Sequence, residues 1–246
     1  MLLESGRLIA IGDVHGCAHA LDAVLDAIEP AADDRLVFLG DLVDQGKETK
    51  EVLDRILELQ QRTRVVLIQG NHEEMMFAAR ENEKALRYWE NCGGVATLNS
   101  YRFGGTLDDI PAAHWTLLDE SRPYYETDDF IFTHANYLPD LPLADQPGYQ
   151  LRWALFDPAK ERPHDSGKTV VVGHTEQKNA EILDLGFARC IDTVCWKYGW
   201  LTAIDMPTRE VWQASRWGVL REPDEATHRG RLMEILRPST RKEAVA

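Results

Sequence analysis

Apolar and polar residues alternate along the N-terminal third of the chain with two distinct periods. Apolar runs at 7–13, 35–41 and 64–71 are dense in β-branched or large aliphatic residues, and each closes on a glycine and a polar side chain. Such runs are typical of buried parallel strands. The segments 18–29 and 47–60 repeat apolar residues every three or four positions, which indicates amphipathic helices. The pattern predicts a β-α-β-α-β unit.

The pattern changes after this unit. Residues 72–120 show mostly helical periodicity, with a helix end predicted at Gly93–Gly94 and a further short helix after Pro111. Later apolar runs, separated by short turns, predict a second sheet without helical crossovers. These runs lie at 129–133, 169–172, 180–185, 188–194, 200–205 and 210–214. We expect an α/β fold whose core is a two-sheet β-sandwich flanked by helices.

Length and charge refine this picture. A chain of 246 residues without a linker-like stretch favours one large domain, 1–220, followed by a charged C-terminal tail, 221–246. The 27 Lys and Arg residues face 41 Asp and Glu residues, which gives a formal net charge of −14. A polyanion repels nucleic-acid phosphates, so we expect no nucleic-acid partner. Bound divalent cations are the one means of inverting that field locally.

Cysteine spacing and the N-terminus bear on the compartment. The four cysteines show neither CxxC spacing nor the density of a disulfide scaffold, which favours buried thiols in reducing surroundings. The segment "MLLESGRLIAIGD" lacks the basic region and long apolar stretch of a signal peptide, and no stretch approaches the ~18 apolar residues of a membrane span. We expect a cytoplasmic protein without a membrane partner. The oligomeric state is not predicted.

Candidate chemistry collects where the predicted strands end. The three parallel strands close on "GDVHG", "GDLVDQG" and "GNHEE", and two later runs end in "FIFTH" and "VVVGH". Ligands bind beyond the carboxyl ends of the strands in an open parallel sheet, so these polar side chains should converge on one rim. They are Asp13, His15, Asp41, Asp44, Asn71, His72, His134 and His174.

A metal centre explains why several carboxylates would share one rim. Carboxylates in a buried site repel one another unless cations neutralise them, and two divalent cations would do so. Carboxylate, amide and imidazole ligands without a thiolate favour Mn²⁺, with Fe, Co, Ni or Zn as alternatives to it. Glycines beside the ligands allow the backbone to approach a metal or phosphate closely. They are Gly12, Gly16, Gly40, Gly46 and Gly70.

The order of these motifs resembles the calcineurin-like metallophosphoesterase superfamily, and within it the bacterial PPP-type serine/threonine protein phosphatases. The resemblance covers about residues 7–205 and includes "YWENCGGVATLNSY" at 88–101 and "CIDTVCWKYGWLTAIDM" at 190–206. It implies the four-layer αββα arrangement of that superfamily and a dinuclear metal centre.

The resemblance also implies a role for each motif residue. The ligands would be Asp13, His15 and Asp41 for one metal, and Asp41, Asn71, His134 and His174 for the other. A hydroxide between the metals would attack phosphorus in line. His72 would protonate the leaving oxygen, and Asp44 would orient the His72 ring.

The phosphate-binding positions depart from the family pattern. The second motif usually has Arg after its second Asp, whereas this chain has Gln45, and Glu73 would then lose its expected partner. Arg152 lies near the place of another expected phosphate-binding Arg, and Asn136 stands where the family tends to have glycine. Gln45, Asn136 and Arg152 are therefore the candidate substrate-binding residues.

The predicted function is di-metal-dependent hydrolysis of phosphate monoesters, acting on phosphoserine or phosphothreonine in proteins, with dual specificity or small phosphoesters as further options. The alternative is a dinucleoside-polyphosphate hydrolase of the diadenosine tetraphosphate type, because "GDVHGC" also occurs in that branch. The intact Asp44 and "GNHE" favour the phosphatase. A catalytically inactive phosphate-binding scaffold is disfavoured, because every expected ligand and His72 are present. Trp196, Tyr198 and Trp200 form either a wall of the substrate groove or part of the core.

Overall fold

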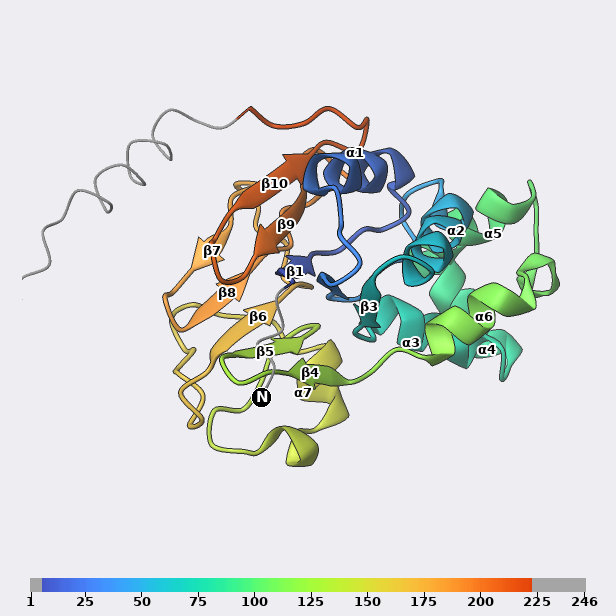
Figure 1. Cartoon of the computed structure of the whole chain (residues 1–246). Coiled ribbons are helices and arrows are strands. Elements are labelled where there is room, and N and C mark those ends of the chain that lie inside the picture. The colour runs from blue at the N-terminus through green and yellow to red at the C-terminus, as the bar shows by residue number, and fades with distance from the viewer. Residues whose placement is uncertain (1–5, 223–246) are drawn as a thin grey trace, which may run out of the picture.

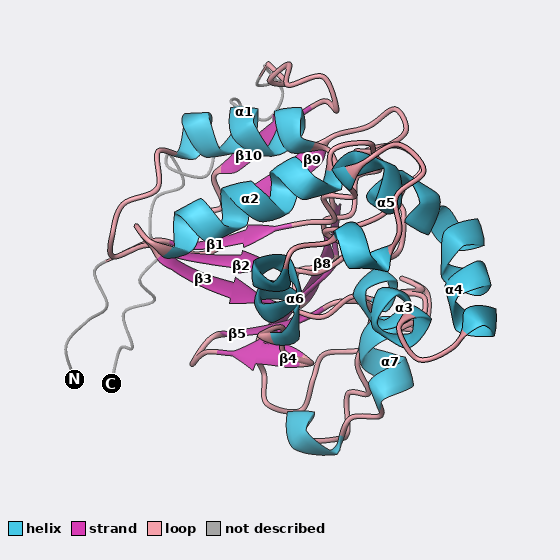
Figure 2. Ribbon diagram, turned by 90° about the vertical axis from the view of Figure 1, so that its right-hand side faces the viewer, coloured by secondary structure: helices cyan, strands magenta, loops and turns pink. Residues whose placement is uncertain are grey.

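The N-terminal half of the chain builds the first sheet as predicted. The computed structural model describes residues 6–222, so of the predicted tail only its first two residues fall within the described part. Strands β1 (Leu8–Ile11), β2 (Arg35–Phe38) and β3 (Arg64–Leu67) run parallel, with Ile9 opposite Leu36. Helices α1 (Ala18–Ile28) and α2 (Thr49–Gln60) connect them and lie across one face of the sheet (Figure 2).

The last two strands of the chain join this first sheet, not the second, and here the prediction from sequence was wrong. Strands β9 (Leu201–Asp205) and β10 (Val211–Ala214) form a hairpin, and β9 pairs antiparallel with β1. The order across the sheet is β10-β9-β1-β2-β3, and Figure 1 labels β10, β9, β1 and β3 of it. The apolar run of a strand identifies it as buried but does not specify which sheet it joins.

The second sheet has the order β4-β5-β6-β8-β7. Its strands are β4 (Tyr124–Glu126), β5 (Phe130–Thr133), β6 (Thr169–Val172), β7 (Leu183–Asp184) and β8 (Ala188–Cys190). The strands β5, β6 and β8 run parallel, and β4 and β7 lie antiparallel at the two edges. The short strand β4 was not predicted.

Helices gather where the parallel strands of the first sheet end (Figure 2). They include α3 (Asn71–Ala79), α4 (Glu83–Trp89), α5 (Val95–Tyr101) and α6 (Ala112–Asp119), the last beginning directly after Pro111 as predicted. The short α7 (Gly148–Arg152) lies between β5 and β6, so the second sheet does have a helical crossover. Two 3-10 turns span Leu107–Asp109 and Leu143–Asp145.

The helix end predicted at Gly93–Gly94 is instead a kink. A π-helical turn, Glu90–Gly94, continues from α4 into α5, and Gly93 has a φ of 118° within it. A side chain at Gly94 would collide with the ring of the buried Trp89, because its Cβ would lie 2.4 Å from that ring. The glycine pair therefore turns the chain while keeping α4 and α5 packed together.

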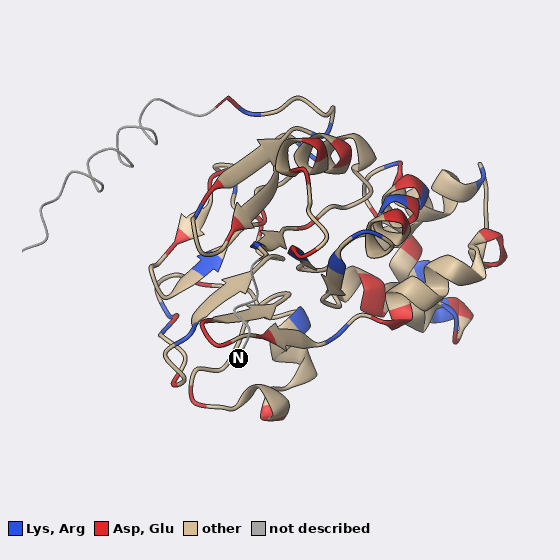
Figure 3. Cartoon of the chain, in the orientation of Figure 1, with Lys and Arg blue, Asp and Glu red and all other residues tan. Residues whose placement is uncertain are grey.

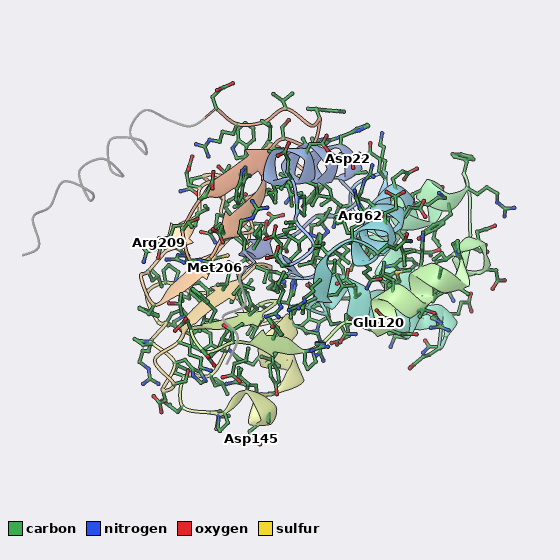
Figure 4. All side chains as sticks on the ribbon, in the orientation of Figure 1. Asp22, Arg62, Glu120, Asp145, Met206 and Arg209 are labelled. Carbon is green, nitrogen blue, oxygen red and sulfur yellow. The ribbon has the colours of Figure 1, made fainter. Side chains whose placement is uncertain are left out.

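Alternating side chains of the strands produce the layers of the fold. Ala10 and Val37 of the first sheet pack against Phe132 and Val171 of the second, and Met206, labelled in Figure 4, belongs to the same layer. The intervening residues of β1 face α1 and α2. The two-sheet sandwich with helices outside is therefore confirmed.

Charges of both signs are interspersed along the described residues. Figure 3 shows Asp and Glu spread over the helices, with Lys and Arg scattered among them. The four cysteines are free thiols; Cys17, Cys190 and Cys195 are buried as predicted, whereas Cys92 is only half-buried. Among the described helices, none combines the length and apolarity that crossing a bilayer requires. The cytoplasmic location stays a prediction.

Candidate metal centre

The carboxyl ends of five strands bring the predicted ligands to one rim of the sandwich. Strand β1 leads into Asp13 and His15, β2 into Asp41, and β3 into Asn71 at the start of α3. In the second sheet, β5 leads into His134 and β6 into His174. The side chains that the sequence places far apart thus come together as parallel-strand geometry requires.

Asp41 lies at the middle of this cluster, and its two carboxylate oxygens point to different histidines. Its Oδ2 is 3.4 Å from His15 Nε2, and its Oδ1 is 3.3 Å from His134 Nε2. Two groups of potential ligands share it, each with ligand atoms within 4.8 Å of one another: His15, Asp41 and His72, and Asp41, His134 and His174. A single buried carboxylate therefore has one oxygen available to each of two sites.

Backbone carbonyls orient the imidazole rings. His15 Nδ1 lies 3.0 Å from the oxygen of Val43, and His134 Nδ1 lies 2.8 Å from the oxygen of Leu39. Each Nδ1–H donates to its carbonyl, so a neutral ring presents the lone pair of Nε2, which is the atom that a metal would bind. Burial, opposed by the charge of Asp41, lowers the pKa of His15 to about 4, which keeps its ring neutral.

His174 is turned the other way. Its Nε2 donates to the carbonyl of Trp153 at 3.1 Å, so Nδ1 is the free nitrogen. That nitrogen lies 3.0 Å from Asn71 Oδ1, and His134 Nε2 lies 2.9 Å from the same oxygen. Two imidazoles and one amide oxygen therefore converge beside Asp41, a donor set that suits a divalent transition metal.

Asp13 belongs to neither of the two ligand groups, yet its environment fits a cation. Its Oδ2 accepts from the backbone N–H of His174 at 2.9 Å, while its buried Oδ1 has no hydrogen-bond partner among the described residues. Burial and the negative charges of Asp192 and Asp41 raise the pKa of Asp13 well above its usual range. An orphaned carboxylate oxygen among other carboxylates is a position where a divalent ion would remove the electrostatic cost.

Close backbone approach requires glycine beside two of these carboxylates. A Cβ at Gly70 would lie 2.1 Å from Asp41 Oδ1, and a Cβ at Gly173 would lie 2.0 Å from Asp13 Oδ1. Any side chain at either position would displace a carboxylate from the rim. The glycine of "GNHE" was predicted for this reason, whereas Gly173 of "VVVGH" was not.

The backbone of the rim adopts conformations that ordinary residues avoid. Positive φ angles of 45° to 71° occur at non-glycine residues of the predicted site, namely His15, Asp41, Asp44, Gln45 and His174. Such angles cost energy and persist only where surrounding contacts impose them, and they concentrate at functional sites.

Glu73 supplies one of those contacts, because backbone N–H groups bind it in place of the arginine that the sequence lacks. Its carboxylate accepts from the backbone N–H groups of Asp41 at 2.9 Å, Leu42 at 2.7 Å and Gly70 at 2.9 Å. Glu73 therefore holds the loop after β2 against the start of α3 without any arginine.

His72 and Asp44 form the pair that the resemblance implies. His72 Nδ1 lies 2.7 Å from Asp44 Oδ2, and His72 Nε2 lies 4.0 Å from Asp41 Oδ2. Burial acts to lower the pKa of His72, but the charge of Asp41 and the hydrogen bond to Asp44 outweigh it and raise the pKa to about 9. With Nδ1 hydrogen-bonded to Asp44, the Nε2 atom is the one that faces the cluster.

Two residues that sequence reasoning missed hold Asp44 in place. Trp89 Nε1 donates to Asp44 Oδ2 at 2.8 Å, and Thr97 Oγ1 donates to Asp44 Oδ1 at 2.7 Å. Both stand in "YWENCGGVATLNSY", so the motif was recognised but its hydrogen bonds were not. Asp44 is fully buried, and these donors replace the water it has lost.

The candidate substrate-binding residues Arg152 and Gln45 both have hydrogen-bond partners within the protein. Arg152 Nε is paired with Glu74, which also accepts from Trp153 Nε1 at 3.1 Å. Arg152 therefore lies next to the carbonyl that orients His174, but a carboxylate already neutralises it. Gln45 Nε2 donates to the carbonyl of Cys92 at 2.9 Å.

Asn136 has a structural environment. Its amide nitrogen donates to the carbonyl of Leu155 at 2.9 Å and to Glu161 Oε1 at 3.0 Å, and its oxygen accepts from the backbone N–H of Tyr137 at 2.7 Å. The side chain is buried and committed to neighbouring loops. Nothing in these contacts directs it toward a substrate.

One of the three aromatic residues near the C-terminal hairpin approaches the rim. The ring of Trp196 lies 6.3 Å from that of His15, centroid to centroid. The Tyr198 hydroxyl donates to the carbonyl of Lys178, and the guanidinium of Arg221 lies over the ring of Trp200. Of the three, Trp196 alone has a ring contact with a proposed ligand among the described residues.

The two-sheet fold carries at this rim a set of carboxylate, amide and imidazole groups that suits divalent metal ions. Residues 6–195 match the family model of the calcineurin-like phosphoesterases, and the chain belongs to this family.

Two curated relatives of the chain share one name. The chain is 35% identical over 138 residues to a symmetrical bis(5'-nucleosyl)-tetraphosphatase from Janthinobacterium sp. (strain Marseille). The matched region covers 53% of this chain and 43% of the relative. It is 32% identical over 162 residues to the protein of the same name from Burkholderia pseudomallei (strain 668), covering 63% of this chain and 51% of the relative. The matched region thus spans about half the length of these curated relatives.

Solved structures show the same fold. A candidate diadenosine tetraphosphatase superposes with a TM-score of 0.65 at 20% identity, covering 85% of this chain and 93% of the other. A protein serine/threonine phosphatase from Saccharomyces cerevisiae gives a TM-score of 0.62 at 14% identity, covering 90% and 82%. At such identities the likeness establishes the architecture alone.

Proposed function

We propose that the chain hydrolyses dinucleoside polyphosphates and cleaves a dinucleoside tetraphosphate symmetrically, into two nucleoside diphosphates. The relatives at 35% and 32% identity, both named for this symmetrical reaction, support the proposal. The yeast protein phosphatase shares only 14% identity, so it gives no support for a phosphoprotein substrate. The alternative drawn from the sequence is therefore favoured over the serine/threonine phosphatase.

The observation that carries the reaction type is the position of Asp41, with one oxygen toward His15 and the other toward His134. We infer that it is shared by two divalent cations, Mn²⁺ in the first instance. The ligands proposed are Asp13, His15 and Asp41 for one cation, and Asp41, Asn71, His134 and His174 for the other. Such a cation pair, when bound, neutralises phosphoryl charge and makes a water molecule more acidic.

His72 and Asp44 would carry out the proton transfer to the leaving group. The oxygen of water bonds to phosphorus as the bridging P–O bond breaks, and the electron pair of that bond goes to the departing diphosphate. His72 donates its Nε2 proton to the former bridging oxygen of the departing diphosphate. A proton of the attacking water passes to solvent. Asp44 accepts from Nδ1 throughout, so the ring stays aimed at the leaving oxygen.

A substrate panel tests the proposal. The full chain with Mn²⁺ is given diadenosine tetraphosphate, a phosphoserine peptide, p-nitrophenyl phosphate and its bis ester, and nucleotide products are separated by ion-exchange chromatography. We expect diadenosine tetraphosphate to have the highest kcat/KM and to give ADP as the sole nucleotide product.

Three other outcomes would each redirect the assignment. Products AMP and ATP would contradict symmetrical cleavage. A phosphopeptide that outcompetes the dinucleotide would restore the protein phosphatase. No turnover of any substrate with Mn²⁺, Fe²⁺, Co²⁺, Ni²⁺ or Zn²⁺ would favour the inactive scaffold.

A further inference from the structure

A pocket opens beside the candidate centre, between the loop that follows β2 and helix α5. Its volume is about 610 Å³, within the ~300–1,000 Å³ of small-molecule sites. The lining residues are Gln45, Lys47, Gly93, Val95, Ala96, Asn99 and Phe103. None of these residues is among the proposed metal ligands or the acid pair.

The pocket shares its walls with the acid pair. Gln45 follows Asp44 directly, and its amide donates to the carbonyl of Cys92 beside Gly93. Helix α5 contributes from both faces, because Thr97 donates to Asp44 while Val95 lines the pocket. Gln45 and helix α5 thus connect the pocket with the acid pair.

The pocket presents a flat apolar surface to solvent. The side chain of Phe103 is 94% exposed, and that of Val95 is 49% exposed. A single exposed aromatic side chain is ordinary on a protein surface. Here it borders a pocket at the end of α5, where a planar heteroaromatic ring could stack on it and exclude water from both.

Polar groups of the pocket are also uncommitted. Asn99 Oδ1 accepts from the backbone N–H of Gly104 at 2.9 Å, but its amide nitrogen has no partner within residues 6–222. Lys47 forms no ion pair with any described carboxylate. In a chain with a net charge of −14, an unpaired ammonium group beside the catalytic loop favours an anionic ligand.

We propose that this pocket binds the nucleoside of the departing nucleoside diphosphate. The base would stack on Phe103, the Asn99 amide would donate to the base or ribose, and Lys47 would contact the diphosphate. This inference rests on the proposed function, since it assigns a place to one half of a dinucleoside polyphosphate. Measurements of ADP binding can test it without any measurement of hydrolysis.

The test compares ADP with inorganic pyrophosphate, which has the charge but no nucleoside. Dissociation constants are measured by titration calorimetry with Mn²⁺ present, for the full chain and for Phe103→Ala. We expect ADP to bind the unmodified chain more tightly than pyrophosphate. Loss of the stacking surface should weaken ADP binding about 5- to 100-fold, with pyrophosphate binding unchanged.

Two further variants make the result specific. Phe103→Tyr retains a ring and should bind ADP as the unmodified chain does. Trp217→Ala removes an aromatic side chain that is 72% exposed but lies outside the pocket, and should have no effect. Equal binding of ADP and pyrophosphate by the unmodified chain, or unchanged ADP binding by Phe103→Ala, would overturn the inference.

The same preparations separate this inference from the proposed function. If the chain binds ADP through Phe103 but does not cleave diadenosine tetraphosphate, the pocket proposal stands and the proposed activity is contradicted. If the unmodified chain cleaves diadenosine tetraphosphate and Phe103→Ala has the same ADP affinity and KM, the proposed activity stands and the pocket proposal is contradicted.

Discussion

The candidate metal centre and the pocket beside Gln45 share a loop but are built in opposite ways. In the centre, buried side chains are held by backbone groups, as when Glu73 binds the N–H groups of the loop after β2. In the pocket, Phe103 is exposed and Lys47 has no ion-pair partner among the described residues. The fold therefore fixes the positions of the groups in the centre, whereas the pocket that we propose for the nucleoside presents exposed side chains.

The largest effect should come from the carboxylate shared by both proposed cations. Asp41→Asn should abolish activity and reduce bound metal from about two ions per chain toward one or none, because one carboxylate serves both sites. Metal analysis after gel filtration and kcat on the substrate panel measure this. Asp54→Asn, which changes a carboxylate outside the centre, is the control. Two tightly bound metals in Asp41→Asn would show that the ligand set is wrong.

Removing the proposed acid should have the next largest effect, and the effect should depend on the leaving group. His72→Asn should lose ~10²–10⁴-fold on an alkyl phosphate, whose alkoxide needs a proton, and clearly less on p-nitrophenyl phosphate. Metal content should stay unchanged. Equal losses on both substrates would instead assign His72 to metal or phosphate binding.

A smaller effect should follow from loosening Asp44. Trp89→Phe keeps the buried ring but removes the hydrogen bond to Asp44, so kcat should fall about 10-fold or more, with KM and metal content unchanged. If Trp89 acts through the acid pair, the same change in a His72→Asn background should add almost nothing. Additive losses in the double variant would assign Trp89 to general packing.

The smallest effect should occur at the boundary between the two regions. Gln45→Arg would place a guanidinium beside the acid pair, and a partly exposed charge contact lowers KM about two- to fivefold. The kcat should not change, because Glu73 already holds the loop without an arginine. A large change in kcat would mean that Gln45 positions the catalytic loop.

The two regions also differ in how far the sequence predicts them. The strand ends with Asp13, Asp41 and Asn71 were predictable, because each ligand follows its own apolar strand within two to four residues. Their convergence then follows from parallel pairing.

Contacts between distant segments were not predictable. Periodicity marks β9 and β10 as strands but cannot show that they pair with β1, and the motif that holds Trp89 does not reveal its bond to Asp44. Asn136 was selected as a departure from a family pattern, yet its amide binds neighbouring loops. An exposed Phe103 carries no sequence signal, because one aromatic residue has no period.

The central position of β1 has a consequence for the order of events during synthesis. One edge of β1 pairs with β2 soon after both emerge, since Ile9 lies opposite Leu36, but the other edge waits for β9, where Ile9 lies opposite Asp205. Such distant pairing is slow, and an unpaired edge invites association with other chains. Because His134 and His174 emerge later, the nascent first half holds its carboxylates with only His15 and His72 of the four imidazoles at the rim. Strands β5 and β6 bring the other two before β9 emerges, and the pairing of β9 with β1 then closes the remaining edge.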